Sequence, residues 1–406
     1  MHTEKSRYLM PVTLRPDVVM HHGRGSFLWD HDGRRYLDLL QGWAVNSLGH
    51  APPELVEVIA RQAERLLTPS PALHNEPQLA LAERLCTLAR MHQAHFTITG
   101  AEANEAAVKL ARKWGRLHRQ GAYEILTTQN SFHGRTLALM AASGKPGWER
   151  MYPPHIPGFI KVPFGDVAAM REAIGPATVA ILVEPIQGEG GVVVPPDGYL
   201  AALRALADEH DLLLMLDEVQ TGIGRTGTLF ACQHEAVKPD VMTLGKGLGA
   251  GLPISALLAN RRASCFEPGD QGGTFNGNPL GAAVALRVLE IVAEPCFLET
   301  VVRAEHELRA GLEAIAADFG GSVRGRGLLL AWVLDAPLAP DIVERARERG
   351  LLVNAARPSI LRVMPSLRIL SDEIALALAL LRQAAEEVFA PLGQGRPAAT
   401  EQLPQS

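Results

Sequence analysis

A single lysine lies in a glycine-rich segment that follows an apolar run. Lys246 belongs to the segment 243–254, which holds four glycines around it and no other charge. A lysine that is removed from water has a lowered pKa, and its neutral amine is then a nucleophile. The segment is not a phosphate-binding P-loop, because Asp240 stands where the leading glycine would be and Gly247 follows the lysine. The alternative is an ordinary surface loop.

A carboxylate ends another apolar run earlier in the chain. Residues 212–216 are apolar, and Asp217 and Glu218 follow them at once. In open α/β sheets ligands bind outside the carboxyl ends of the strands, which favours a binding role. Enzymes that use pyridoxal phosphate need a Schiff-base lysine and a carboxylate for the pyridinium nitrogen, which Lys246 and Asp217 could supply. The alternative is that both acids begin a solvated loop.

Two glycine motifs could bind phosphate. Gly100 lies in the segment 99–105, which follows a short strand pattern and opens a helical one; free N–H groups at such a point form an anion site. Capping of the helix by Thr99 is compatible with this role. The second motif, at 222–227, matches G-x-G-x-x-G, but only the short segment 230–235 follows it and no acid stands where a ribose would bind. We expect a tight loop there.

Strand and helix patterns alternate around these residues. Apolar strands separated by helices predict a mostly parallel sheet that is covered on both faces. Near the N-terminus an Asp-Gly turn predicts a hairpin, and the end of the chain mixes short strands with helices. The expected strands are 25–29, 35–39, 96–99, 124–127, 179–183, 212–216, 241–244, 327–332 and 361–364. One helix is expected to begin at Pro53. The other expected helices cover 78–88, 103–114, 200–209, 278–317, 341–349 and 371–389.

The composition fits a folded protein of two domains. The chain has 406 residues, 47% of them hydrophobic, and a formal charge of −5. A mildly acidic chain has no electrostatic footprint for nucleic acid or an anionic membrane. No apolar run approaches the roughly 18 residues that span a bilayer, the N-terminus has no signal-peptide core, and the four cysteines are too far apart for a disulfide framework or a zinc site. We therefore expect a cytoplasmic enzyme with a small substrate and no metal.

Five motifs resemble those of class III aminotransferases, most of all the acetylornithine aminotransferase branch. They are TGAEANEAAVKLAR (99–112), NSFHGRT (130–136), VEPIQGEGGV (183–192), LDEVQTGIGRTG (216–227) and TLGKGLGAGLPI (243–254). The resemblance covers residues 29–389 and implies the type I aminotransferase fold, an α/β fold. A large domain (53–285) would carry the mostly parallel sheet. The N-terminal part (1–52) and the C-terminal part (286–392) would form a smaller α+β domain, and we expect 393–406 to be a disordered tail.

The resemblance also implies a role for each matching residue. Lys246 would form the Schiff base with pyridoxal 5'-phosphate and Asp217 would pair with the pyridine nitrogen. The other cofactor contacts would be Gly100, Ala101 and Thr274 at the phosphate, Phe132 and Val219 on the ring faces, and Gln220 at the ring hydroxyl. The substrate contacts would be Arg135 for a carboxylate, Glu189 and Arg362 as the pair that adapts the site to two substrates, and Gly273 beside Thr274. Thr274 would come from the partner subunit of a homodimer.

The implied reaction moves the ω-amino group of N2-acetylornithine, or of a similar amine, to 2-oxoglutarate by a ping-pong route. Other donors stay open, among them N-succinylornithine and 4-aminobutyrate. So do other classes that share Lys246 and Asp217, namely a racemase, mutase or decarboxylase, and a non-catalytic cofactor-binding protein. Two carboxylate-binding arginines, Arg135 and Arg362, favour a transaminase, which must accept a dicarboxylic substrate.

The chain departs from the family pattern at three points. Gly273 stands where the acetylornithine branch has Thr or Ser, and Arg357 stands where it has Gly before Pro358. Gly42-Trp43 lacks the tyrosine that ornithine δ-aminotransferases have there, which argues against free ornithine as the donor.

Overall fold

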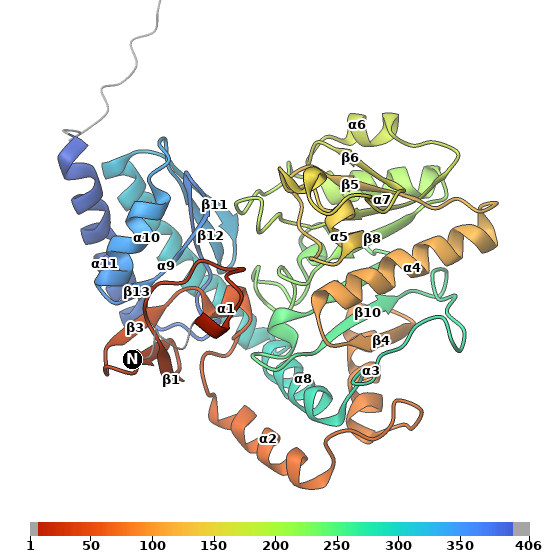
Figure 1. The fold of residues 1–406 in the computed structure, drawn as a ribbon, viewed down its shortest axis with the longest axis horizontal. Coiled ribbons are helices and arrows are strands. Elements are labelled where there is room, and N and C mark those ends of the chain that lie inside the picture. Colours follow the sequence, from red (N-terminus) through yellow and green to blue (C-terminus); the bar gives the residue numbers. More distant parts are fainter. Residues whose placement is uncertain (1–6, 393–406) are drawn as a thin grey trace, which may run out of the picture.

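The computed structural model describes residues 7–392, and a seven-stranded sheet forms its largest part (Figure 1). The strand order is β4-β10-β9-β8-β7-β5-β6, in which β10 is antiparallel to both neighbours and all other pairs are parallel. This confirms the predicted mostly parallel sheet. The strands are β4 (Gln93–Thr97), β5 (Glu124–Thr128), β6 (Phe159–Val162), β7 (Thr178–Val183), β8 (Leu213–Asp217), β9 (Val241–Leu244) and β10 (Ser255–Ala259).

Helices cover both faces of this sheet, as fully apolar strands require. The residues of β8 alternate: Leu213 and Met215 pack in the cluster that contains α4 (Gly100–His118), whereas Leu214 and Leu216 pack in the cluster that contains α7 (Tyr199–Glu209). By the same alternation Asp217 points to the α4 face. The remaining helices of this part are α2 (Pro53–Arg65), α3 (Glu76–Ala89), α5 (Leu137–Ala142), α6 (Val167–Glu172) and α8 (Pro279–Val292).

The two ends of the described chain form the smaller domain, where red and blue segments lie together in Figure 1. β13 (Leu351–Leu352) pairs in parallel with β3 (Arg35–Asp38), so one sheet, β1-β2-β3-β13, is built from both ends. This confirms the α+β domain of mixed origin, while the domain boundaries given above stay a prediction. Its other elements are β1 (Met20–Arg24), β2 (Phe27–Asp30), α1 (Gln41–Ala44), α9 (Pro295–Phe319), β11 (Ser322–Arg326), β12 (Leu329–Val333), α10 (Ala339–Glu348), β14 (Asn354–Arg357), β15 (Ile360–Val363) and α11 (Ser371–Phe389).

The structure corrects several element boundaries. α4 begins at Gly100 rather than at 103, and the strand before it ends at Thr97. The stretch 278–317 is two helices, because Glu294 is extended (φ −68°, ψ 127°) and Pro295, which has no N–H to donate, opens α9. In the large sheet, β6 and β10 were not predicted. The tail 393–406 lies outside the described residues, and within 7–392 no helix combines the length and apolarity needed to cross a bilayer.

The loop 222–227 of the large domain is hydrogen-bonded to the smaller domain. It is a tight loop, as predicted, with Ile223 and Gly224 at φ +57° and +84°, and only a short 3₁₀ turn follows it. Within it Arg225 is buried and donates from Nη1 to the carbonyl oxygens of Leu328 (3.1 Å) and Pro365 (2.6 Å). Burial lowers the pKa of Arg225 to about 9. Its hydrogen bonds tie the loop to the smaller domain.

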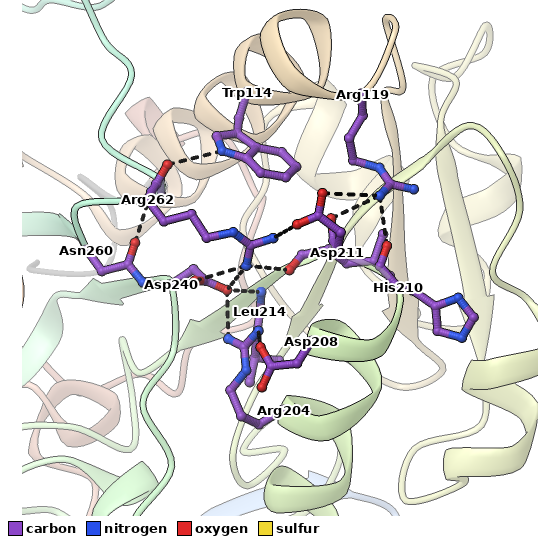
Figure 2. A network of polar contacts seen from close by, with 12 residues as sticks. Trp114, Arg119, Arg204, Asp208, His210, Asp211, Leu214, Asp240, Asn260 and Arg262 are labelled. Atoms are coloured by element: carbon purple, nitrogen blue, oxygen red, sulfur yellow. Dashed lines mark hydrogen bonds and ion pairs between the residues drawn. The ribbon is translucent and has the colours of Figure 1, made fainter.

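A buried carboxylate fixes the amino ends of the central strands (Figure 2). Asp240 precedes β9 and its side chain is 5% exposed. It accepts hydrogen bonds from Arg204 Nη1 (2.7 Å), the Leu214 N–H (2.9 Å), Asn260 Nδ2 (2.8 Å) and Arg262 Nη1 (3.4 Å). The network holds β8 and β9 in register at the edge of the sheet opposite Asp217.

We expect Asp240→Asn to lower the free energy of unfolding by about 3 kcal/mol, because it leaves two guanidinium groups without their buried partner. The matched control is Asp211→Asn in the same network, since Asp211 is 66% exposed and pairs with Arg262 at 2.6 Å. An exposed pair contributes less than about 1 kcal/mol. Urea denaturation followed by circular dichroism measures both, and equal losses would contradict a special role for Asp240.

Candidate active site

The carboxyl ends of β7, β8 and β9 meet at one edge of the sheet, because these strands are adjacent and parallel. Glu184 follows β7, Asp217 ends β8 and Thr243 lies in β9. Each lies two residues after one that packs in the α4 cluster, namely Leu182, Met215 and Val241, so the three side chains share the α4 face. Lys246 follows β9 at the same edge. The fold therefore brings two acids, a hydroxyl and a lysine together.

Asp217 is buried and surrounded by donors. Its Oδ2 atom lies 2.8 Å from Asn104 Nδ2 and 2.8 Å from His133 Nδ1, and its Oδ1 accepts from the Val219 N–H at 3.1 Å. Asn104 is itself fixed by the Thr243 hydroxyl, which donates to Oδ1 at 2.7 Å. A carboxylate can be taken out of water only when such donors replace the solvent. The alternative that Asp217 and Glu218 begin a solvated loop is wrong, because they are 4% and 0% exposed.

Glu184 is a second buried acid beside Asp217. It accepts hydrogen bonds from the N–H groups of Phe132 (2.9 Å) and Gly188 (3.2 Å), but no cation pairs with it among residues 7–392. Burial raises the pKa of Glu184 to about 7, and the nearby Asp217 charge adds to the rise. The site thus holds a carboxyl group that changes its charge near neutral pH.

Lys246 stands in a strained backbone conformation between glycines. Its φ of +43° lies in the left-handed region, which is uncommon for a residue with a side chain. Burial lowers the pKa of the Lys246 amine, and the Glu189 charge opposes this effect. The expectation of a desolvated lysine is confirmed.

The N-terminus of α4 offers an anion site beside Lys246. Thr99 and Glu102 form a capping box in which the Glu102 N–H donates to Thr99 Oγ1 (3.2 Å) and the Thr99 N–H donates to Glu102 (2.8 Å). The box leaves the N–H groups of Gly100 and Ala101 without a partner in the helix. A Cβ at position 100 would lie 2.7 Å from Cγ1 of Val219, so glycine is needed for this close approach.

A buried arginine at the site is paired with a glutamate. The Arg362 side chain is 0% exposed, and its Nη1 lies 2.8 Å from Oε1 of Glu189. Its Nε and Nη2 donate to Oδ1 of Asn354 at 3.1 and 2.7 Å, and Gln220 Oε1 lies 3.5 Å from Nη1. The resemblance implied this pairing of Glu189 with Arg362, and the structure has it.

Arg135 lies at the solvent side of the site, against two aromatic rings. Its Cζ is 6.0 Å from the centre of the Phe132 ring and 5.6 Å from that of Trp148. The residue is exposed, and no carboxylate in the described chain pairs with it. A guanidinium in this position is available to a substrate carboxylate.

The structure gathers most of the predicted site residues and leaves two apart. Thr274 and Gly273 lie in the loop between β10 and α8, where Thr274 is exposed and its hydroxyl makes no hydrogen bond within 7–392. Several residues that hold the predicted ones in place were not predicted from the sequence. They are Asn104, His133, Glu184, Thr243 and Asn354. Only Glu184 and Thr243 had a signal in the sequence, since Glu184 directly follows the apolar run 179–183 and Thr243 is the polar residue within the run 241–244.

Together the fold and the site define an enzyme of the type I aminotransferase architecture, with a lysine and an aspartate at the carboxyl edge of the large sheet. The chain belongs to the class III aminotransferases, since the model of the family "Aminotransferase class-III" matches residues 10–385.

Similar proteins include acetylornithine aminotransferase 2 of Bordetella bronchiseptica, with 50% identity over 92% of this chain and 96% of that protein. Acetylornithine aminotransferase of Ralstonia nicotianae is 49% identical over 92% and 96%. Among solved structures, ornithine aminotransferase of Toxoplasma gondii has a TM-score of 0.92 at 33% identity and covers 96% of this chain and 95% of its own. N-acetylornithine aminotransferase of Stenotrophomonas maltophilia has a TM-score of 0.83 at 38% identity, and the match covers 96% of this chain and 99% of that chain.

The enzyme depends on pyridoxal 5'-phosphate, and its residues fit that cofactor. The Nε2 atom of Gln220 is buried and has no partner in the described chain, which leaves a donor for the ring hydroxyl. Gly100 and Ala101 present free N–H groups suited to the phosphate, and Asp217 supplies the carboxylate that a pyridinium nitrogen requires. When bound, the cofactor forms a Schiff base with amines and withdraws electrons from them.

The raised pKa of Glu184 predicts a pH dependence of stability. Its folded pKa of about 7 exceeds the ordinary value of 4.5, so its contribution is fully present below pH 4.5 and is lost as the pH rises through 7. Glu184→Gln cannot ionise. Between pH 5 and pH 8 the wild-type free energy of unfolding should fall by about 3 kcal/mol relative to this variant. Urea titrations of the cofactor-free proteins test this, and parallel pH profiles would contradict it.

Proposed function

We propose that this enzyme transfers the ω-amino group of N2-acetylornithine to 2-oxoglutarate, in two half-reactions that share one site. The names of its closely similar relatives support this donor. The observation that carries the proposal is the Glu189–Arg362 ion pair at 2.8 Å, with Arg362 wholly buried. We expect the reaction to take place in the cytoplasm.

This ion pair suits a site that must accept two unlike substrates. The donor has one carboxylate, remote from the reacting amine, and Arg135 would bind it. Arg362 would then have no substrate anion, and Glu189 would neutralise its buried charge. The acceptor has two carboxylates, so Glu189 must release Arg362, which would then bind the one beside the keto group. Two-point Arg–carboxylate geometry suits such an exchange.

Lys246 and Asp217 would carry the chemistry in both half-reactions. Lys246, displaced by the amine of the substrate, would take the proton from the substrate carbon and return it at the cofactor. Burial lowers the pKa of the Lys246 amine, which favours the neutral form that can accept that proton. Asp217, held by Asn104 and His133, would keep the pyridine nitrogen protonated. Val219 and Phe132 would hold the ring in place from its two faces.

The arrangement of the loop around Thr274 supports a homodimer with a shared site. Thr274 would complete the phosphate site of the partner subunit, since it is exposed in its own chain. The next residue, Phe275, is 59% exposed and lines an apolar groove together with Leu67, half exposed, and Ile98. Ile98 stands two residues before Gly100, so a second chain seated on this groove would lie beside the phosphate site.

The donor and the role of Lys246 can be tested by absorbance. Adding N2-acetylornithine to the holoenzyme should remove the absorbance of the lysine-bound cofactor, and 2-oxoglutarate should restore it. Lys246→Ala should lower turnover more than about a thousandfold, because it removes the proton carrier. The control is Lys238→Ala, an exposed lysine outside the site. An absorbance that never responds to an amine would contradict a transaminase. A response to glutamate but not to any ω-amine would contradict the donor.

Mixed subunits test the shared site. Thr274→Ala and Lys246→Ala proteins are each expected to be impaired, because each lesion affects every site of its own homodimer. In a mixed dimer one site would carry both lesions and the other neither, so activity should rise to about half of the wild-type value per mixed dimer. Exchange is verified by mass spectrometry of the dimers. Proven exchange without recovery would place both residues in the site of one subunit.

A further inference from the structure

The loop that carries Thr274 is held at one end by a lysine of α4. The Lys113 side chain is 8% exposed, and its Nζ atom pairs with Oε2 of Glu267 at 2.8 Å and with Oδ2 of Asp270. Both acids lie in the loop between β10 and α8, which runs beside α4 (Figure 1), and they precede Thr274 by seven and four residues. The proposed reaction gives Lys113 no role.

Further hydrogen bonds complete this anchor. The Glu267 N–H donates to Oδ2 of Asp270 at 2.6 Å, and the Asp270 N–H donates back to the Glu267 carbonyl at 3.1 Å, so a turn forms at the ion pair. One helical turn before Lys113, Lys109 donates to Oε1 of Gln271. Hydrogen bonding to Asp270 raises the pKa of Lys113, and hydrogen bonding to Lys113 lowers the pKa of Asp270, so both are charged at neutral pH.

The other end of the loop is fixed at α8. The side chain of Asn278 caps this helix, and Nδ2 of Asn75 donates to the Gly277 carbonyl at 3.1 Å. Between the two ends, the N–H groups of 271–275 make no hydrogen bond within the described chain. Thr274 therefore lies on a short span whose position depends on how its ends are held.

Glycines make the span depend still more on its anchor. Gly272 and Gly273 directly precede Thr274, and a Cβ at position 272 would meet no atom within 4 Å, so packing does not restrict this backbone. Gly273 is also the position where the acetylornithine branch has Thr or Ser. A residue with a side chain limits the backbone more than glycine does, so this chain lacks a local restraint. The ion pairs of Lys113 supply a restraint from outside the span.

Lys113 is remote from the phosphate site of its own chain. Gly100 and Ala101 begin α4, and Lys113 follows Gly100 by thirteen residues, about 20 Å along the helix. A change at Lys113 therefore cannot act on that site by contact. The loop that Lys113 holds carries Thr274, which the shared site would place at the phosphate of the partner subunit.

We propose that Lys113 is a positioning residue for the cofactor site of the partner subunit. Its ion pairs with Glu267 and Asp270 hold the loop in the conformation in which Thr274 donates to the phosphate. This inference rests on the shared site of the proposed function and adds the group that maintains it. Each α4 then serves both sites of the dimer, since its N-terminus binds the phosphate of its own chain and Lys113 places the threonine for the other.

The first experiment measures the dissociation constant of pyridoxal 5'-phosphate by titrating the dialysed dimer and following absorbance. Lys113→Met should raise the constant about tenfold, as should Thr274→Ala, because each removes the same charge-assisted hydrogen bond to the phosphate. The double variant should match Thr274→Ala alone. Lys113→Arg keeps the charge and should retain most of the affinity. The control is Arg309→Met, which breaks an ion pair with Glu305 (2.9 Å) on α9 and should leave the constant unchanged.

Mixed dimers show in which subunit Lys113 acts. A dimer of one Lys113→Met chain and one Lys246→Ala chain, isolated by two affinity tags, has one site with its lysine. The threonine of that site comes from the chain that keeps Lys113. The cofactor concentration for a half-maximal rate with glutamate should therefore equal the wild-type value. A value as high as in the Lys113→Met homodimer would overturn the inference.

The affinities also separate this inference from the proposed function. If Thr274→Ala raises the dissociation constant and Lys113→Met does not, the inference alone fails. If Thr274→Ala does not raise it, the shared site fails and the inference with it. A failure of N2-acetylornithine as the donor would leave both affinities as they are. Melting temperatures at saturating cofactor show whether each variant is folded, and Asp270→Asn, whose side chain is 29% exposed, repeats the test from the loop.

Discussion

A carboxylate buried at the end of an apolar strand imposes demands on everything around it. Asp217 is shielded from water, so its oxygens need hydrogen-bond donors from the protein. These are Asn104 of α4, His133 in the segment after β5 and the backbone N–H of Val219 in the next loop. The donors need support as well, which explains the Thr243 hydroxyl on Asn104 and the Ser143 hydroxyl on the backbone N–H of His133. Much of the polar structure at this edge of the sheet thus serves one side chain.

One helix links the two ends of the cofactor site. The free N–H groups of Gly100 and Ala101 begin α4, and Asn104 follows one turn later on the same face of the helix. Four residues of helix span about 6 Å, so the distance from the anion site to the Asp217 carboxylate is fixed by helix geometry. The capping box at Thr99 stabilises this end of the helix. A rigid spacing of this kind suits a cofactor that has a phosphate at one end and a ring nitrogen at the other.

The sequence predicts the sheet well, because β7, β8 and β9 are apolar runs that end at polar residues. The sequence analysis did not identify two of its strands, β6 and β10, and β10 is a short run that directly follows a glycine-rich segment. The sequence pattern also predicts one helix where the structure has α8 and α9, because the apolar periodicity continues across Pro295. In the site, Lys246 and Asp217 follow from their residue types and their places at strand ends. Asn104 and His133 do not, since only the tertiary fold brings a helix and a loop to Asp217 and their local patterns have no special feature.

The hydrogen bonds of Arg362 explain how its ion pair can be exchanged. A buried guanidinium that lost its only partner would be trapped at a high cost. Arg362, however, keeps Asn354 as an acceptor for two of its nitrogens, and Gln220 lies near a third, so its orientation does not depend on Glu189. Glu189 is the partner that is free to move, because its side chain is 29% exposed while that of Arg362 is fully buried. In the proposed reaction the arginine would therefore be a fixed binding group, and the change between substrates would require movement of the acid alone.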